Sequence, residues 1–420
     1  MKKAMLLCLV LCLPAALLSS CGDARFYETS NETFGIELNP PTYSINDTKN
    51  SLDEAYLAYH GRYYKDKEAL WMSFSNAGFE VTFYGKVLEG SFYATAADSD
   101  LNRPYLAVAI DNDLDPDNMK AVRLTSSGAY SNATTTKNGY TLHPHVILAS
   151  FENEGKHTIR VYKRSECQNS QVGVISLSSD GTILPVEKKS LDLKIEVFGD
   201  SVTCGYAVES DDYYEKFSTR TENSTKSYAN YAANYLNADV SLVSAGGYGL
   251  YKSAYTENLK PDNVAEMFSL ADFTYDTNDS NRHSWDNSKY VPDVVVVALG
   301  ANDASKLATY SKGSDDYNSF LSIYKEKYVD FLSLIKTTYP DCVIISSSEI
   351  IPFSDDIVLK TDEAVEEYNA SKGNVVTRFK DDAYTTSKDK TTPGAGHPNQ
   401  EMQKIAGREL ANCIDDVLSI

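Results

Sequence analysis

The chain contains an unbroken apolar stretch, Val294 to Leu299, which is followed directly by Gly300-Ala301-Asn302-Asp303. A strand that is apolar at every position has both faces buried, as in a parallel sheet covered by helices. Further strands are expected at Lys194 to Phe198, Val240 to Val243 and Val343 to Ser346, with helices at Ser227 to Leu236 and Lys325 to Thr338. This alternation predicts an α/β domain with a doubly wound parallel sheet over residues 189–420.

The preceding part of the chain has a different pattern, in which short apolar or aromatic runs are separated by turn residues. These runs are Leu70 to Phe74, Phe79 to Tyr84, Tyr105 to Ile110, Val146 to Ser150, His157 to Tyr162 and Val172 to Leu177. Evenly spaced runs of this kind are typical of an all-β sandwich. We therefore expect a β-sandwich domain over residues 51–188 and a domain boundary near residue 188.

The pattern of the first residues predicts an export signal. Lys2 and Lys3 precede an apolar run, Ala4 to Leu18, that is too short to span a membrane. The stretch Leu18-Ser19-Ser20-Cys21 looks like a bacterial lipobox, in which Cys21 becomes the lipid-bearing N-terminus. The alternative is an ordinary secretory signal. We expect residues 1–20 to be a lipoprotein signal, residues 21–50 a tether, and the protein to be exported and lipid-anchored at a bacterial membrane, periplasmic or on the cell surface.

Charge and cysteine content restrict the partners. The net charge is -20, and removal of Lys2 and Lys3 makes it -22, which disfavours nucleic acid and anionic lipid as partners. Cys167, Cys204, Cys342 and Cys413 have no zinc-site spacing, and a chain of this length does not require disulfides. No cofactor is predicted.

Two motifs follow expected strands with residues suited to acyl chemistry. In Gly199-Asp200-Ser201-Val202-Thr203-Cys204-Gly205, Ser201 stands at a strand-to-helix turn, where a nucleophile is exposed and its backbone N–H faces an anion. The alternative is a plain helix cap. In Ser244-Ala245-Gly246-Gly247-Tyr248-Gly249, glycines let backbone N–H groups approach an oxyanion, and the alternative is a flexible loop.

Two further residues complete the set. Asn302, after the apolar strand, can donate its side-chain amide to an oxyanion, and the alternative is a turn with a side-chain hydrogen bond. His397 precedes Pro398 and an expected helix from Gln400 to Leu418, so that it sits on a fixed turn. A lone histidine is usually structural, but the order of the four motifs makes a common site the better interpretation.

The four motifs together resemble the SGNH hydrolases. The resemblance implies that Ser201 is the nucleophile and His397 the general base. It further implies that the N–H groups of Ser201 and Gly247 and the amide of Asn302 form the oxyanion hole.

One position departs from that family, where an Asp usually stands three residues before the histidine. Here that position is Gly394. Either a backbone carbonyl orients the imidazole of His397 or a remote acid does, with Glu349 and Asp389 as candidates; we favour the carbonyl. A Ser-His dyad suffices for esters, because their leaving group is better than that of amides.

The missing acid, the Cys in Gly199 to Tyr206 and a preceding sandwich make the chain similar to carbohydrate esterase family 2. Segments that resemble that family's jelly-roll domain are Gly61-Arg62-Tyr63, Trp71 with Phe79 to Val81, Gly155 to Arg160 and Tyr162 to Glu166. The resemblance implies metal-independent removal of acetyl groups from acetylated polysaccharide such as xylan or glucomannan.

Aromatic residues near these motifs are candidates for stacking on sugars, namely Tyr206, Tyr248 and Trp285; Trp285 is equally suited to packing.

Two patterns that resemble metal sites are not interpreted as such. The alternating acids Asp111 to Asp117 lack the glycine and glutamate of a calcium loop and are interpreted as a solvated hairpin turn. His143 and His145 lack a third ligand and are interpreted as loop residues.

Two rival functions remain from the sequence. The sandwich could bind glycan beside a catalytically silent SGNH domain, although such a scaffold has no reason to keep Ser201, Asn302 and His397 together. Alternatively, the esterase could act on other acyl esters as a lipase does, although no amphipathic lid helix is evident.

Overall fold

The computed structural model describes residues 43–44, 54–95, 102–124, 135–137, 140–187, 191, 193–254, 261–273, 282–348, 350–351, 353–373, 375–380 and 396–419. The predicted signal, Cys21 and most of the predicted tether lie outside the described residues. None of the helices in these ranges combines the length and the apolarity that a bilayer span requires.

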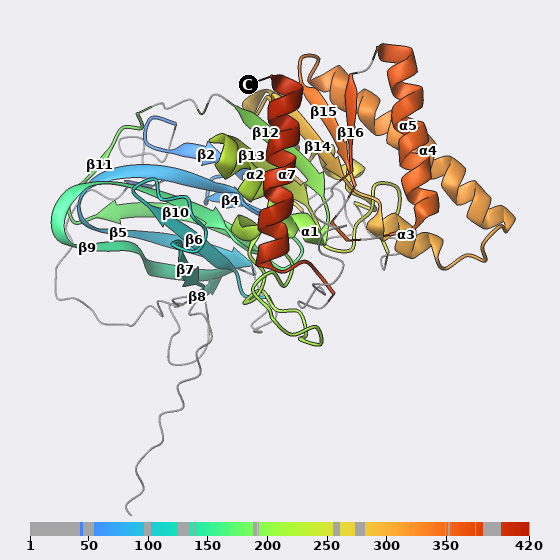
Figure 1. The fold of residues 1–420 in the computed structure, drawn as a ribbon. Helices are drawn as coiled ribbons and strands as arrows, with labels where there is room; N and C mark the ends of the chain where they lie inside the picture. Colours follow the sequence, from blue (N-terminus) through green and yellow to red (C-terminus); the bar gives the residue numbers. More distant parts are fainter. Residues whose placement is uncertain are drawn as a thin grey trace, which may run out of the picture.

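The first part of the chain forms an antiparallel sheet of 11 strands with the path β3-β4-β10-β5-β9-β6-β7. Its strands are β1 (Tyr43–Ser44), β2 (Ala58–His60), β3 (Tyr63–Lys65), β4 (Leu70–Met72), β5 (Gly78–Thr95), β6 (Tyr105–Ile110), β7 (Lys120–Arg123), β8 (Thr135–Lys137), β9 (Tyr140–Lys163), β10 (Gln171–Ser179) and β11 (Thr182–Leu184). The sheet curls around a core of buried side chains that includes Trp71, Phe79 and Phe83 (Figure 1). The prediction that this part is all-β is confirmed, and we call this part the β-domain.

Two very long strands bend around that core. β5 has 18 residues and β9 has 24, and they pair along nearly their whole length with register shifts at Gly85/Val87, Leu88/Glu89 and Gly90/Phe92. The prediction of separate short strands at 146–150 and 157–162 was wrong, because both belong to β9. Bulges bend a strand without interrupting it, and the turn residues between the two runs lie at such a bend.

His143 and His145 both lie in β9 rather than in the predicted loop. The side chain of His143 is buried, and that of His145 is 78% exposed. Burial disfavours the charged imidazolium and lowers the pKa of His143 to about 4.

This lowered pKa predicts a loss of stability in acid. An unfolded histidine has a pKa of about 6.5, so between that pH and about 4 the unfolded chain binds the proton that the folded chain excludes. The contribution of His143 is therefore present above pH 6.5 and falls, by roughly 3 kcal/mol in total, as the pH drops toward 4. Urea unfolding at pH 7 and 4.5 should show a smaller acid loss for His143→Gln than for the wild type. His145→Gln is the matched control, and an equal change in both variants would contradict the prediction.

The second part of the chain contains a parallel sheet of five strands in the order β13-β12-β14-β15-β16. The strands are β12 (Lys194–Gly199), β13 (Asp239–Ser244), β14 (Val294–Ala298), β15 (Val343–Ser347) and β16 (Val376–Phe379). The predicted doubly wound α/β fold is confirmed, and its first four strands lie where the sequence predicted them. We call this part the α/β-domain.

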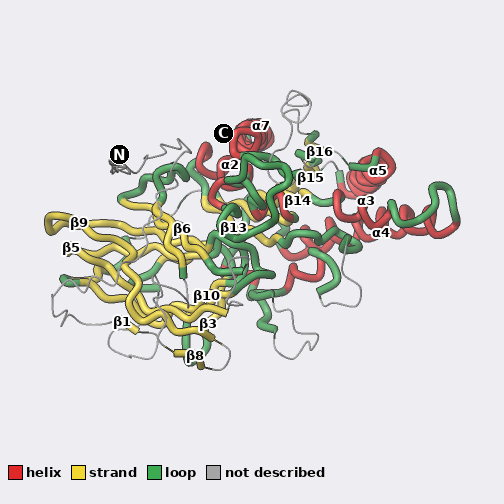
Figure 2. Tube along the Cα trace, turned by 90° about the horizontal axis from the view of Figure 1, so that it is seen from below, coloured by secondary structure: helices red, strands yellow, loops and turns green. Residues whose placement is uncertain are grey.

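Helices cover both faces of the parallel sheet (Figures 1 and 2). One face packs on α2 (Tyr228–Leu236) and α7 (Gln400–Leu418), and the other packs on α4 (Asp315–Thr338) and α5 (Asp355–Lys372). Two short helices, α1 (Ser201–Cys204) and α3 (Ala301–Leu307), begin at the carboxyl ends of β12 and β14.

Buried polar side chains join the two domains. The guanidinium of Arg62 donates from Nε to Glu196 Oε1 at 3.0 Å, and neither side chain is exposed. His60 Nδ1 lies 2.9 Å from Asp239 Oδ1, and Asn76 Nδ2 donates to Asn230 Oδ1 at 2.9 Å. Because these bonds connect residues of the β-domain with strands and a helix of the α/β-domain, they fix the two domains against each other.

Candidate active site

Ser201 lies on a tight turn at the carboxyl end of β12. Asp200 caps α1, accepting from the Val202 N–H at 3.0 Å, and Gly205 ends the helix with a positive φ of 70°. A Cβ atom at Gly205 would lie 2.2 Å from the backbone oxygen of Asn223, so only glycine fits there. The helix-cap interpretation of Asp200 is therefore correct, and the same cap holds Ser201 at the start of the helix.

His397 faces this serine from the other end of the α/β-domain sequence. Its Nε2 lies 2.8 Å from Ser201 Oγ, so the hydroxyl can donate to the imidazole. Asn399 caps α7 by accepting from the Met402 N–H at 3.0 Å, and Gln403 of the same helix donates to the Val202 carbonyl at 3.0 Å. These bonds tie the helix after His397 to the helix of Ser201. Glu349, Asp389 and Gly394, which bear on what orients the imidazole, lie outside the described residues.

The sheet register brings the other predicted residues to the same edge. Gly199 pairs with Ser244 of β13 and with Ala298 of β14, so the turns after these three strands lie side by side. Asn302 Nδ2 donates to Asp200 Oδ2 at 2.7 Å and to the Tyr248 carbonyl at 3.2 Å. The amide thus connects the turns after β12 and β13. Both of its protons have protein acceptors, so donation to an oxyanion requires that one of these bonds be exchanged.

Two buried carboxylates hold the glycine loop after β13, and sequence reasoning assigned a role to neither. Asp303 accepts from the N–H groups of Leu250, Tyr251 and Lys252 at 2.7–2.9 Å, and burial raises its pKa to about 7. Glu166 of the β-domain accepts from the Gly246 N–H at 2.6 Å. The loop is therefore anchored from both sides, and the alternative of a flexible loop does not hold.

The prediction of sugar stacking was wrong for two of the three residues. Tyr248 is 1% exposed and packs edge-on against Phe273. Trp285 is 6% exposed and belongs to the core of the β-domain, beside Tyr63 and the Arg62 guanidinium. A ring covered by protein cannot present its face to a sugar. Tyr206 is half-buried, with its ring centroid 4.3 Å from that of His397, and its substrate contact stays a prediction.

The structure places other aromatic rings beside the site. Tyr213 and Tyr214 are 54% and 87% exposed, with ring centroids 5.2 Å apart. A Cβ atom at Gly396 would lie 3.9 Å from the ring of Tyr213, so this tyrosine adjoins the residue before His397. Tyr213 lies near Gly396 because two segments far apart in sequence are in contact. The sequence around Tyr213, which is rich in acidic residues, did not indicate a place in the site.

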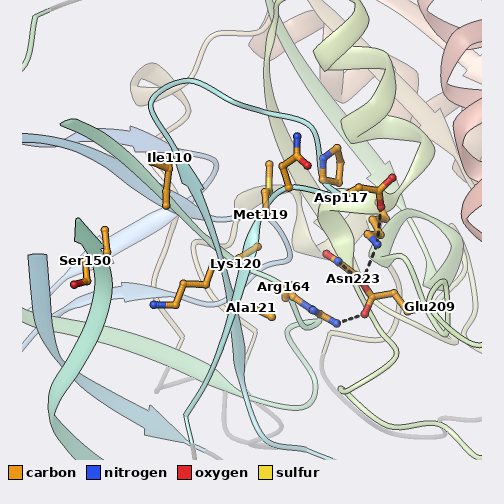
Figure 3. Close-up of a pocket in the computed structure, with 14 residues that line it drawn as sticks. Ile110, Asp117, Met119, Lys120, Ala121, Ser150, Arg164, Glu209 and Asn223 are labelled. Atoms are coloured by element: carbon orange, nitrogen blue, oxygen red, sulfur yellow. Dashed lines mark hydrogen bonds and ion pairs between the residues drawn. The ribbon is translucent and has the colours of Figure 1, made fainter. Parts of the chain in front are cut away.

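A cavity of about 590 Å³ lies between the β-domain and the α/β-domain (Figure 3). Its wall includes the ion pairs of Arg164 with Glu209 and of Lys226 with Asp117, but neither Ser201 nor His397. Asp117 also accepts from Gln400 Nε2 at 2.7 Å. The run Asp111 to Asp117 lies in the β6–β7 hairpin as predicted, but it is not simply solvated, because Asp117 contacts the first residue of α7.

The four cysteines that the structure describes are free thiols. Cys204 Sγ donates to Ser244 Oγ at 3.2 Å, and Cys167 Sγ to the Ser244 carbonyl at 3.3 Å. Burial raises the pKa of both thiols, so they stay protonated and act as packing residues behind the site.

A serine within hydrogen-bond reach of a histidine, on a turn after a parallel strand, is the arrangement of a serine hydrolase. A model of the GDSL-like lipase/acylhydrolase family matches residues 195–410. The chain belongs to this family.

Relatives and solved structures extend the similarity to the β-domain. The cellulase/esterase CelE of Acetivibrio thermocellus is 28% identical over 293 residues, which are 70% of this chain and 31% of that protein. An acetylxylan esterase / glucomannan deacetylase of Cellvibrio japonicus is 33% identical over 201 residues, 48% of this chain and 51% of that protein. The chain thus spans between about a third and a half of the length of these relatives.

Two solved structures share the fold. A family two carbohydrate esterase from Clostridium thermocellum, in complex with cellohexaose, has a TM-score of 0.68 at 23% identity and covers 86% of this chain and 99% of its own. An acetyl xylan esterase from Butyrivibrio proteoclasticus has a TM-score of 0.72 at 19% identity, and the match covers 90% of this chain and 99% of that protein. The resemblance to SGNH hydrolases and to carbohydrate esterase family 2 is confirmed.

Proposed function

We propose that this protein is a carbohydrate acetyl esterase that removes O-acetyl groups from a plant-type polysaccharide such as acetylxylan or glucomannan. The observation that carries the proposal is the 2.8 Å separation of His397 Nε2 and Ser201 Oγ at the carboxyl edge of the parallel sheet. Names of the relatives, which include acetylxylan esterase and glucomannan deacetylase, support the substrate class.

The reaction proceeds in two steps on this pair. Ser201 Oγ attacks the acetyl carbonyl carbon while its proton passes to His397 Nε2, and the carbonyl oxygen becomes an oxyanion. Collapse of this intermediate breaks the ester bond, and the sugar oxygen leaves with the proton from His397. Water then attacks the acetyl-serine, His397 again takes and returns the proton, and acetate leaves.

The oxyanion is stabilised by N–H groups from the three adjacent turns. These are the backbone N–H groups of Ser201 and Gly247 and the side-chain amide of Asn302, which gives up one of its two present acceptors to donate to the substrate. Loss of one such donor lowers kcat about 10²- to 10³-fold in serine hydrolases, so the oxyanion hole accounts for a large part of the rate enhancement.

Features of the surface support a neutral glycan as the substrate. Tyr213 is exposed next to Gly396, the ring of Tyr214 lies beside that of Tyr213, and amphipathic rings stack well on sugars. The net charge of -20 disfavours anionic polymers.

Acetate release from a panel of acetylated polysaccharides by the purified protein tests the proposal. We expect faster release from acetylated xylan or glucomannan than from long-chain 4-nitrophenyl esters, and no loss of activity with chelator. Preference for long acyl chains would support the lipase alternative. Binding of the glycans without release of acetate would support the silent-scaffold alternative.

A further inference from the structure

The β-domain contacts the loop that carries the predicted oxyanion donor Gly247. Its contact segment is the connection between β9 and β10, from which Glu166 and Gln168 project. Glu166 Oε2 accepts from the Gly246 N–H at 2.6 Å, and Gln168 Nε2 donates to the Gly246 carbonyl at 2.5 Å. Both polar groups of Gly246 are thus bound by side chains from the other domain.

This pair of bonds determines how the next N–H points. The carbonyl of Gly246 and the N–H of Gly247 belong to one planar trans peptide group, in which C=O and N–H point in opposite directions. Because Gln168 holds the carbonyl toward the β-domain, the Gly247 N–H points away from the β-domain. Gly247 has a φ of 81°, a conformation that glycine adopts without strain.

Glu166 is itself held in place. It is 4% exposed, and its backbone N–H donates to Glu222 Oε2 at 3.0 Å while its backbone carbonyl accepts from Lys163 Nζ at 3.0 Å. A Cβ atom at position 246 would lie 2.9 Å from Glu166 Oε2, so the glycine there leaves room for the carboxylate. The carboxylate and the loop therefore lie in close contact at Gly246.

We infer that Glu166 is a positioning residue for the oxyanion hole, and that with Gln168 it fixes the direction of the Gly247 N–H. The β-domain is then part of the catalytic apparatus through this contact. This inference rests on the proposed function, because it assigns Glu166 a role in the same acyl transfer.

The test compares Glu166→Ala with Glu166→Gln in the full chain, using 4-nitrophenyl acetate. Glu166→Ala should lower kcat about 10- to 100-fold with KM nearly unchanged, since an oxyanion donor acts mainly in the transition state. Glu166→Gln keeps an oxygen that accepts from the Gly246 N–H and should recover most of kcat. A boronic acid, which forms a tetrahedral adduct with a serine oxygen, should bind Glu166→Ala more weakly by a similar factor.

His60→Ala is the matched control, because it removes another bond between the domains, His60 to Asp239, at the opposite end of β13 from the glycine loop. It should lose stability and keep kcat. If Glu166→Ala does not fold, Gln168→Ala tests the inference instead, and we expect it to lower kcat several-fold.

A folded Glu166→Ala, or in its place Gln168→Ala, with wild-type kcat and boronate affinity would overturn the inference. Equal loss in Glu166→Ala and His60→Ala would also overturn it. Activity that survives Ser201→Ala would instead show that the proposed function has failed.

Discussion

Ser201→Ala is expected to lower the rate of acetate release on the order of 10⁵-fold, because it removes the hydroxyl that the proposed mechanism uses to attack the ester. The Ser201 hydroxyl lies 2.8 Å from His397 Nε2, within reach of a base that can take its proton. Initial rates with 4-nitrophenyl acetate and with acetylated xylan measure the effect.

Two further variants make this prediction specific. His397→Ala should lower the rate to a similar degree, and the double variant should be no worse than either single one, because the two residues act as a unit. Ser305→Ala is the control, since Ser305 is exposed on α3 and should leave the rate within about twofold. A Ser201→Ala enzyme with even a tenth of the wild-type rate would rule out Ser201 as the nucleophile.

Arg62→Ala is expected to lower the free energy of unfolding by about 3–5 kcal/mol, the largest effect on stability that we predict. Its removal leaves the buried Glu196 carboxylate without its cation. The carbonyls of Met267, Phe268 and Leu270, which accept from Arg62 at 2.8–3.1 Å, also lose their donor. Urea unfolding monitored by tryptophan fluorescence measures the change.

A surface ion pair provides the comparison. Arg220, whose side chain is 53% exposed, pairs with Glu215, and Arg220→Ala should cost at most about 1 kcal/mol, because solvent screens the pair. Replacing Arg62 and Glu196 together by Met and Gln should recover part of the loss, since no charge is then buried alone. Equal costs for Arg62→Ala and Arg220→Ala would show that burial does not set the strength of this interaction.

The fold class followed from local patterns. The all-apolar run Val294–Ala298 became the central strand β14, and the helix predicted from Gln400 to Leu418 has those bounds in the structure. Apolar periodicity and caps are local properties, so a single sequence displays them. The helix at Asp355–Lys372 and the strand at Val376–Phe379 were not predicted, because their apolar residues are few and mixed with charges.

Candidate site residues were predictable to the extent that they lie in motifs at strand ends. Ser201, Gly247 and Asn302 each follow a parallel strand, and parallel strands place such turns at one edge. The aromatic contacts were not predictable, because thirty tyrosines offer many candidates and exposure depends on what packs over each ring. Tyr248 and Trp285 are covered by protein, whereas Tyr213 and Tyr214 are not.

Short stretches of sequence were thus enough to predict the two-part architecture, the family and the residues for attack, base and oxyanion binding. How these residues are held in place became visible only in the folded protein. Glu166 lies 80 positions before Gly246, and Asn302 lies 102 positions after Asp200, yet each pair is within hydrogen-bond distance. A buried carboxylate or amide that holds a distant loop leaves no local pattern, because its partner is selected by the packing of the two domains.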